Sequence, residues 1–195
     1  MAEEEEMFDA VALFIENFKP SDNLVKPDEE TLKKISESVL PEEYISLIKN
    51  YGFGNYGNGI IKVINPFEYA DSLYTWLGRK DDSKLPIMMT AFGDLFYYRQ
   101  FEDDEDICSL EIHYKDIKVC DINFEGFVED YLLDEETQKY VLRKELFTEA
   151  LERDGELKLN EIFFFVPALA IGGGENIKYI KKGDAITHQN LLLQL

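Results

Sequence analysis

The chain has 195 residues, of which 40 are Asp or Glu and 20 are Lys or Arg, so its formal net charge at pH 7 is −20. A hydrophobic content of 45% and an aromatic content of 13% suffice for a buried core, which excludes disorder as the overall state. The negative charge argues against binding of nucleic acid or an anionic membrane, because such binding begins with basic side chains on phosphates. It favours a basic protein as partner, although solubility alone is an equally good reason for it.

The two cysteines and the acidic start of the chain bear on the cellular compartment in which the protein is expected. Cys108 and Cys120 do not form a CxxC pair, and the chain has 2 histidines, so we expect neither a metal site nor a cofactor. Free thiols are expected, with a disulfide between neighbouring strands as the alternative. The stretch Met1 to Glu6 is not a secretory signal, and no apolar run reaches the roughly 20 residues of a membrane span. These features predict a cytoplasmic protein.

The N-terminal part, about residues 7–55, is predicted to be mainly helical. Apolar residues at helical spacing predict a helix from Met7 to Phe18. Two more helices are predicted to begin where acidic residues follow a proline, at Pro27 and Pro41. A glycine-rich stretch, 51–59, comes next and lacks the Lys-Ser/Thr ending of a P-loop. We interpret it as a helix C-cap and an irregular turn rather than a phosphate cradle.

The remaining part, about residues 56–195, is organised around the apolar stretch LPIMMTAFGDLFYY, residues 85–98. Its two apolar arms are joined by Gly93 and Asp94, which predicts a buried hairpin with a tight turn. The same patterns predict further strands and helices, namely strand 60–64, helix 65–77, a second hairpin of 107–114 with 117–122, helices 124–133 and 140–151, strands 161–166 and 177–181, and helix 186–195. We therefore predict one α+β domain over residues 1–195, with a central mixed, mostly antiparallel sheet flanked by helices and a helical N-terminal part.

Four patches, taken in order, resemble a known bacterial family. They are PEEYISLIKNYGFGNYGNG (41–59), INPFEY (64–69), TAFGDLFYY (90–98) and FFFVPALAIGGGENIKYI (163–180). Together they are similar to GAD-like domain proteins with a type VI secretion immunity C-terminal domain and, more distantly, to the SUKH (Smi1/Knr4-like) superfamily. The resemblance implies an α+β fold and binding of a toxin, and the best-known type of member neutralises a DNase effector. It implies no catalytic residues.

Two acidic patches are the candidate partner-binding sites. Five adjacent acids at 102–106 cannot share a core and are expected to be solvated, and the patch 134–136 is expected to cap a helix. The run lacks the alternating ligands and central glycine of a calcium loop, so a plain hairpin tip is the main alternative to a binding surface. Aromatic side chains near the acidic rim are expected to act as anchors. The candidate residues are Glu102, Asp103, Asp104, Glu105, Asp106, Asp134, Glu135, Glu136, Tyr56 and Trp76.

No catalytic constellation is evident. Asp94 is expected to accept turn hydrogen bonds from backbone N–H groups, because the sequence implies no second polar group nearby. Cys108 and His113 are separated by an odd number of residues, so on one regular strand they face opposite sides and cannot form a dyad.

The sequence therefore predicts an immunity protein rather than an enzyme. We expect it to bind a cognate effector toxin, a basic type VI secreted nuclease, and to cover the active site with acidic loops. One alternative is a Smi1/Knr4-like interaction scaffold without a toxin, which a lone gene among housekeeping genes would favour. The other is an enzyme with a small-molecule site at the glycine-rich stretch 51–59, which a bound phosphate or nucleotide would favour. The oligomeric state is left open.

Overall fold

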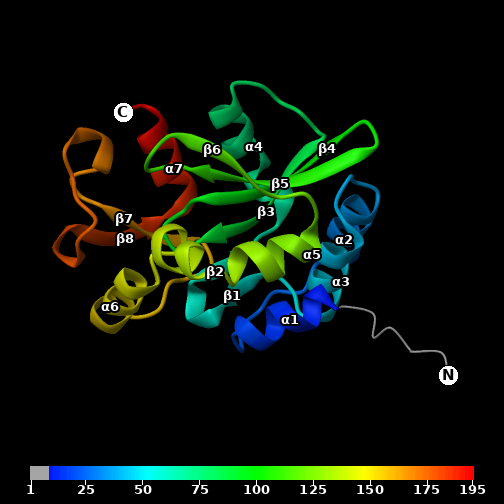
Figure 1. Ribbon diagram of the computed structural model, residues 1–195, viewed down its shortest axis with the longest axis horizontal. Coiled ribbons are helices and arrows are strands. Elements are labelled where there is room, and N and C mark those ends of the chain that lie inside the picture. Colours follow the sequence, from blue (N-terminus) through cyan, green and yellow to red (C-terminus); the bar gives the residue numbers. More distant parts are fainter. Residues whose placement is uncertain (1–8) are drawn as a thin grey trace.

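The computed structural model describes residues 9–195 and has the predicted α+β architecture (Figure 1). Its α-helices are α1 (Ala10–Asn17), α2 (Glu29–Ser36), α3 (Glu42–Asn50), α4 (Pro66–Leu77), α5 (Phe124–Gly126), α6 (Lys144–Asp154) and α7 (Ala185–Leu193). Its strands are β1 (Gly54–Tyr56), β2 (Ile61–Val63), β3 (Lys84–Thr90), β4 (Leu95–Phe101), β5 (Asp104–Glu111), β6 (Asp116–Asp121), β7 (Glu161–Phe165) and β8 (Ile180–Asp184). Five shorter helical segments are η1 (Gly57–Gly59), η2 (Phe127–Leu132), η3 (Thr137–Val141), η4 (Leu169–Ile171) and η5 (Ile177–Tyr179). The predicted helix start at Met7 lies outside the described residues.

Strands β1 to β6 form one sheet in which each strand pairs antiparallel with the next one in the sequence. Strands β7 and β8 form a second antiparallel sheet. The Phe163 N–H donates to the Ala91 carbonyl at 2.8 Å, which fixes the small sheet to the turn between β3 and β4. The mostly antiparallel α+β fold expected from the sequence is thus confirmed.

The predicted central hairpin is the pair β3–β4. Side chains of β4 alternate between the two faces of the sheet, and from Leu95 to Tyr98 both sets are buried, so this part of the hairpin lies inside the molecule. Gly93 has a φ of 90°, and a Cβ at this position would lie 2.6 Å from the Cδ1 of Ile162. Glycine is therefore required in this turn both for its backbone conformation and for its size.

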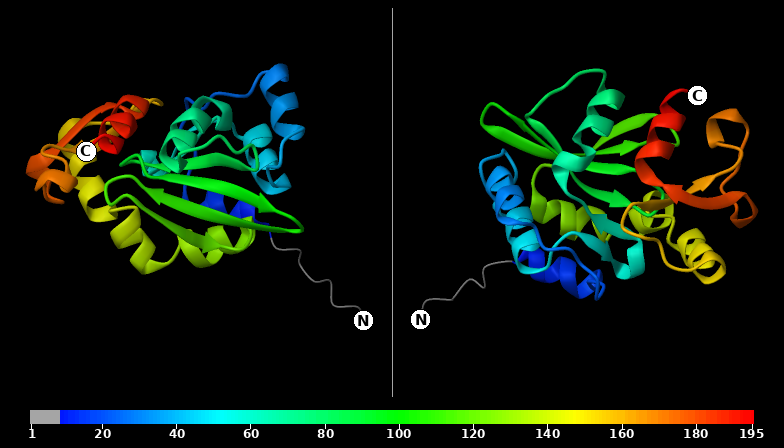
Figure 2. Two further views of the ribbon diagram at one scale, coloured as in Figure 1. Left: turned by 90° about the horizontal axis from the view of Figure 1, so that it is seen from above. Right: turned by 180° about the vertical axis from the view of Figure 1, so that it is seen from behind.

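Helices cover both faces of the six-stranded sheet (Figure 2). Helices α4 and α7 lie on one side, and the α5–η2 segment lies on the other side, where it belongs to the same hydrophobic cluster as residues of α1 and α3. Gln189 fixes α7 in place, because its side chain accepts a hydrogen bond from Ser72 of α4 at 2.7 Å and donates one to the Gly93 carbonyl at 2.9 Å.

Capping residues account for most of the helix ends. Asp28, Asn65 and Asp184 each accept a hydrogen bond from a backbone N–H in the first turn of α2, α4 and α7, respectively. Gly78 and Gly155 follow the last residues of α4 and α6 with positive φ angles. Helices α3 and α4 begin within one residue of their predicted starts, and α2 begins two residues after the predicted start at Pro27.

Three local predictions are corrected. The glycine-rich stretch 51–59 contains the short strand β1, which pairs with β2, and is not only an irregular turn. The helix predicted over 140–151 is interrupted before α6, because Arg143 has a φ of 50°. The last strand begins at Ile180, and the expected first part, Ile177–Tyr179, is a 3-10 turn.

Both cysteines are free thiols in the structure. Cys108 packs with the residues below α4 and α7, and Cys120 packs against the cluster on the opposite face. Within residues 9–195, no helix has the length and apolar character needed to cross a membrane. The same residues contain no group of three or more His, Cys, Asp or Glu placed to hold a metal ion.

Candidate functional site

The acidic run 102–106 forms the tip and first residues of the β4–β5 hairpin. Phe101 pairs with Asp104, so Glu102 and Asp103 make a two-residue turn. Glu102 has a φ of 53°, an uncommon conformation for a residue other than glycine. The side chains of Glu102, Asp103 and Asp104 are exposed. These three acids, which we call the acidic tip, are solvated as the sequence predicted.

The other two acids of the run point back to the hairpin. Asp106 is 5% exposed and accepts a hydrogen bond from the Arg99 Nε at 2.9 Å and a second one from the same guanidinium. Glu105 is half-buried and accepts a hydrogen bond from the Tyr98 hydroxyl. The expectation that all five acids are solvated is therefore wrong. Asp106 is buried because Arg99 lies directly opposite it in the strand register, so that the two form a cross-strand ion pair.

An exposed aromatic side chain lies beside the acidic tip. Phe101 is 45% exposed, and the Arg99 guanidinium lies 5.2 Å from the centre of its ring. Through its hydrogen bonds to Asp106, Arg99 links the ring to the base of the hairpin, and the same hydrogen bonds raise the pKa of Arg99. Phe101 is not among the site residues predicted from the sequence. An aromatic residue directly before an acidic hairpin turn is the signal that could have identified it.

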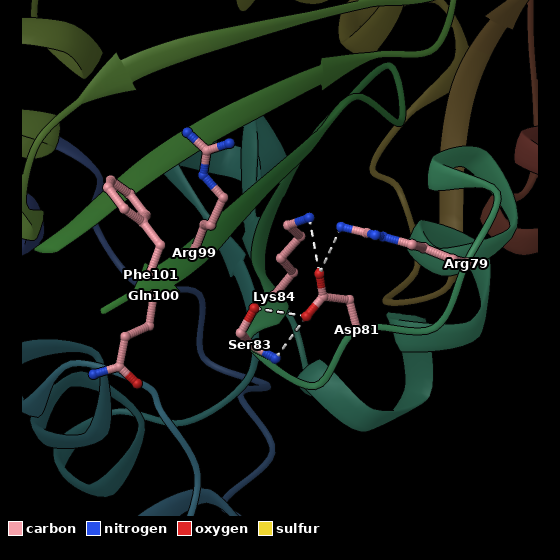
Figure 3. Close-up of a pocket in the computed structure, with 7 residues that line it drawn as sticks. All are labelled: Arg79, Asp81, Ser83, Lys84, Arg99, Gln100 and Phe101. Atoms are coloured by element: carbon pink, nitrogen blue, oxygen red, sulfur yellow. Dashed lines mark hydrogen bonds and ion pairs between the residues drawn. The ribbon is translucent and has the colours of Figure 1, made fainter. Parts of the chain in front are cut away.

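A cavity of about 420 Å³ lies beside the tip of this hairpin (Figure 3). Its lining comes from the loop before β3 and from the end of β4, and comprises Arg79, Asp81, Ser83, Lys84, Arg99, Gln100 and Phe101. Asp81 accepts hydrogen bonds from the Ser83 N–H and hydroxyl at 3.2 Å and 2.6 Å and pairs with the Lys84 Nζ at 2.9 Å. The Ser83 and Lys84 hydrogen bonds lower the pKa of Asp81 to about 2. The cavity thus places three cations beside the acidic tip in an otherwise acidic molecule.

The second acidic patch, 134–136, lies elsewhere. Asp134 accepts a hydrogen bond from the Thr137 N–H at 2.9 Å and so caps the helical turn that begins at Glu135 and continues into η3, as predicted. Glu135 and Glu136 are exposed, and Glu135 lines a separate cavity of about 670 Å³ that also contains Gly57 and Asn58. The patch follows the α5–η2 segment, whereas the acidic tip lies at the far end of the β4–β5 hairpin (Figure 1). The structure does not bring the two patches together.

The two predicted aromatic anchors have different environments. Tyr56 is fully buried, and its hydroxyl donates a hydrogen bond to the Gly52 carbonyl at 2.7 Å. It packs against Phe14 with the ring centres 5.4 Å apart, so the expectation of a surface anchor at Tyr56 is wrong. The reason is that β1 turns this side chain into the core cluster. Trp76 is half-buried near the end of α4, where it packs on the cluster under α4 and α7.

Asp94 forms a buried ion pair that the sequence did not reveal. Its Oδ1 accepts a hydrogen bond from the Ile112 N–H at 2.8 Å, so a backbone N–H is a partner as expected, although from outside the turn. Its Oδ2 lies 2.8 Å from the Arg143 guanidinium, which also binds Glu175 at 2.7 Å. Burial lowers the pKa of Arg143, but the carboxylates of Asp94 and Glu175 raise it, and the net shift is upward. This network joins the central hairpin to the C-terminal part of the chain.

Comparison with known protein families divides the chain into two matched segments. Residues 9–113 match the GAD-like domain. Residues 121–195 match the C-terminal domain of the T6SS immunity protein Tdi1. The resemblance read from the four sequence patches is thereby confirmed for these two families, whereas the more distant SUKH similarity stays a prediction.

A solved structure has a similar fold over nearly the whole chain. The crystal structure of Atu4351 from Agrobacterium tumefaciens matches with a TM-score of 0.72 and 17% sequence identity, covering 96% of this chain and 89% of that one. At this identity the likeness shows the fold alone. A search of curated proteins found no match. Its C-terminal segment matches the C-terminal domain of a type VI secretion immunity protein. Because the first family match covers more than half of the residues, the protein belongs to the GAD-like family.

Proposed function

We propose that this protein is an immunity protein that binds a cognate type VI effector and neutralises it with the acidic tip of the β4–β5 hairpin. The observation that carries the proposal is the match of residues 121–195 to the C-terminal domain of the immunity protein Tdi1. The role proposed is binding rather than catalysis, it takes place in the cytoplasm, and it involves neither nucleic acid nor a membrane.

The charge of the molecule supports a basic effector. An enzyme that cleaves nucleic acid presents positive charge to phosphates, and a net charge of −20 attracts such a surface over several ångströms and raises the association rate. Glu102, Asp103 and Asp104 project from a narrow hairpin, a shape that fits a cleft. We propose that the effector is a nuclease whose basic active-site cleft receives this tip.

The surroundings of the tip supply an anchor and a second charged contact. Phe101 offers a partly exposed ring that is already ordered by Arg99, so little conformational entropy is lost when a partner covers it. In the adjacent cavity, Arg79 and Lys84 lie beside Asp81 and present donors to a carboxylate of the partner. Such mixed charges favour one partner over other basic proteins.

Association kinetics with the purified effector test the proposal. The effector is first captured from the native host with the tagged chain and identified. The triple variant Glu102→Lys/Asp103→Lys/Asp104→Lys is expected to associate at least about tenfold more slowly at low salt, because steering by the tip is lost. The matched control, Glu149→Lys/Glu152→Lys/Glu156→Lys, changes three exposed acids on and after α6 and gives the same net charge.

We expect the control to slow association much less than the tip variant does. The variant Glu135→Lys/Glu136→Lys tests the second acidic patch in the same way. Equal rates for the tip variant and the matched control would contradict a specific role of the tip, because net charge alone would then explain the effect.

A further inference from the structure

Strand β6 is an open edge of the six-stranded sheet. The sheet begins with β1 and ends with β6, and no described strand pairs with the outer side of β6 (Figure 1). The opposite edge is protected, because Pro20 forms a bridge to Tyr56 and Val25 forms one to Phe53. Open edges are templates for pairing with another chain, and natural proteins usually cover or block them.

Backbone groups of β6 point away from the sheet. The Ile117 N–H donates to the Asp116 Oδ1 at 2.9 Å, and the Ile122 N–H donates to the Asp121 Oδ1 at 2.7 Å. The Ile117 N–H is therefore directed away from β5. Antiparallel residues alternate between facing the paired strand and facing away, so the N–H and C=O of Val119 also point outward.

Three apolar side chains along this edge are uncovered. Val119 is 57% exposed, Ile117 is 47% exposed and Ile122 is 71% exposed. Val119 and Ile117 pair with Cys108 and Leu110, which are buried under α4 and α7. The apolar face of the sheet thus continues onto its edge strand and is left exposed there, which is a mark of an interaction site.

The charges around β6 select the kind of partner. Asp116 and Asp121 stand at the two ends of the strand, and the one positive charge between them, on Lys118, is shared by Glu111 at 2.8 Å and Asp116 at 3.5 Å. A strand added at this edge would replace the side chains of Asp116 and Asp121 as hydrogen-bond partners and leave their carboxylates for Lys or Arg. A second copy of this chain would bring two more aspartates and a net charge of −20, which opposes self-pairing.

We propose that β6 is a docking edge that receives an extended basic segment of the effector as a seventh strand of the sheet. Branched apolar side chains at alternate positions of that segment pack beside Ile117 and Val119, and Lys or Arg side chains meet Asp116 and Asp121. The identity of the partner rests on the proposed function. β5 carries the acidic tip near its start and pairs with β6 along its second half, so one effector can cover both surfaces.

A peptide probe tests this edge without the effector. An eight-residue peptide of alternating Val and Lys, blocked at both ends, is titrated into the full chain while the amide NMR signals are followed. We expect shifts that saturate and that are centred on the Ile117 and Val119 amides. A peptide of alternating Val and Glu is expected to bind at least about tenfold more weakly, because its charges repel Asp116 and Asp121.

Val119→Pro removes an outward N–H and leaves the hydrogen bonds between β5 and β6 in place. This variant is expected to bind the Val–Lys peptide about tenfold more weakly than the wild type. Val119→Thr keeps the N–H and the branched shape, and it is expected to bind the peptide as tightly as the wild type. If Val119→Pro does not fold, Ile117→Lys/Val119→Lys serves instead. Ile171→Lys, at a residue that is 60% exposed in another loop, is its control.

Three outcomes would overturn the docking edge: absence of shifts at Ile117 and Val119, equal binding of both peptides, or a dimer of this chain that Val119→Pro dissociates. Co-expression with the effector separates this inference from the proposed function. If Val119→Pro suppresses the toxicity as well as the wild type does, the immunity role stands and the docking edge fails. If the wild type suppresses no toxicity, the immunity role fails, and the peptide titration still decides the edge.

Discussion

Arg143 and Asp94 form the most deeply buried ion pair that the structure describes, with side chains 3% and 0% exposed. Removal of one partner leaves an uncompensated charge in the core. We expect Asp94→Asn to lower the free energy of unfolding by about 3–5 kcal/mol, as measured by chemical denaturation. Glu175→Gln changes the more exposed partner of Arg143 and is expected to cost less than about 1 kcal/mol. If both variants lowered the free energy of unfolding by similar amounts, the larger contribution expected of Asp94 would be contradicted.

Lys62 gives the protein a specific pH dependence. It is fully buried, its Nζ donates to the Lys158 carbonyl at 2.9 Å, and burial lowers its pKa from 10.5 to about 7. Between these values the unfolded chain binds more protons than the folded one, so stability increases with pH. We expect the free energy of unfolding to rise between pH 7 and pH 9, by at most about 1.4 kcal/mol per pH unit from this group.

Lys62→Met removes the titrating amine, so the free energy of unfolding of this variant is expected to rise less between pH 7 and pH 9 than that of the wild type. Measurements stop at pH 9 because burial raises the pKa values of Tyr69 and Tyr74 to about 12, and stability from these groups is lost above their ordinary value of 10.0. Equal slopes for wild type and variant would show that Lys62 does not titrate in this range.

Single-residue roles were predictable where they depend on local sequence. The helix cap at Asp134 and the exposure of Glu102 and Asp103 follow from nearby residues alone. The burial of Asp106 depends on which residue of β4 lies opposite, and the pairing of Asp94 with Arg143 joins residues far apart in the chain. Such contacts are decided by register and tertiary packing, which one sequence does not reveal.

The turn between β3 and β4 determines how the central hairpin fits under the small sheet. Gly93→Ala requires a positive φ for alanine and also places a Cβ 2.6 Å from Ile162. We expect the free energy of unfolding to fall by about 2–4 kcal/mol, because backbone strain and overpacking act together. Gly78→Ala is the matched control, since Gly78 also has a positive φ but has open space around it, and its expected cost is about 1 kcal/mol. Equal melting temperatures of the two variants would contradict the packing argument.

Elements with strong local signals were predicted well, and elements held by distant partners were not. Helix α4 has an Asn cap, Pro at its start and Gly after its end, all visible in the sequence. Strand β1 has three residues within a glycine-rich stretch, and it exists because β2 pairs with it. The start of β8 is set by the pairing of Ile180 with Phe165, and hydrophobicity alone placed the strand three residues too early.

The two family segments share one hydrophobic core. The larger cluster contains Phe14 and Phe96 from the first segment and Phe127 and Phe163 from the second. We therefore expect the chain to unfold in one cooperative transition, with the same midpoint by near-UV and far-UV circular dichroism. Two separate transitions would show instead that the segments are independent domains.

At the scale of the whole molecule, the fold presents an acidic hairpin tip and an open strand edge on a strongly negative body. The central claim is that this molecule protects a cell from one effector by binding it. Growth of cells that express the captured effector, with and without this chain, is the most direct test. We expect the wild-type chain to restore growth and the acidic-tip variant to restore it less. Undiminished toxicity in the presence of the folded wild-type chain would contradict this claim.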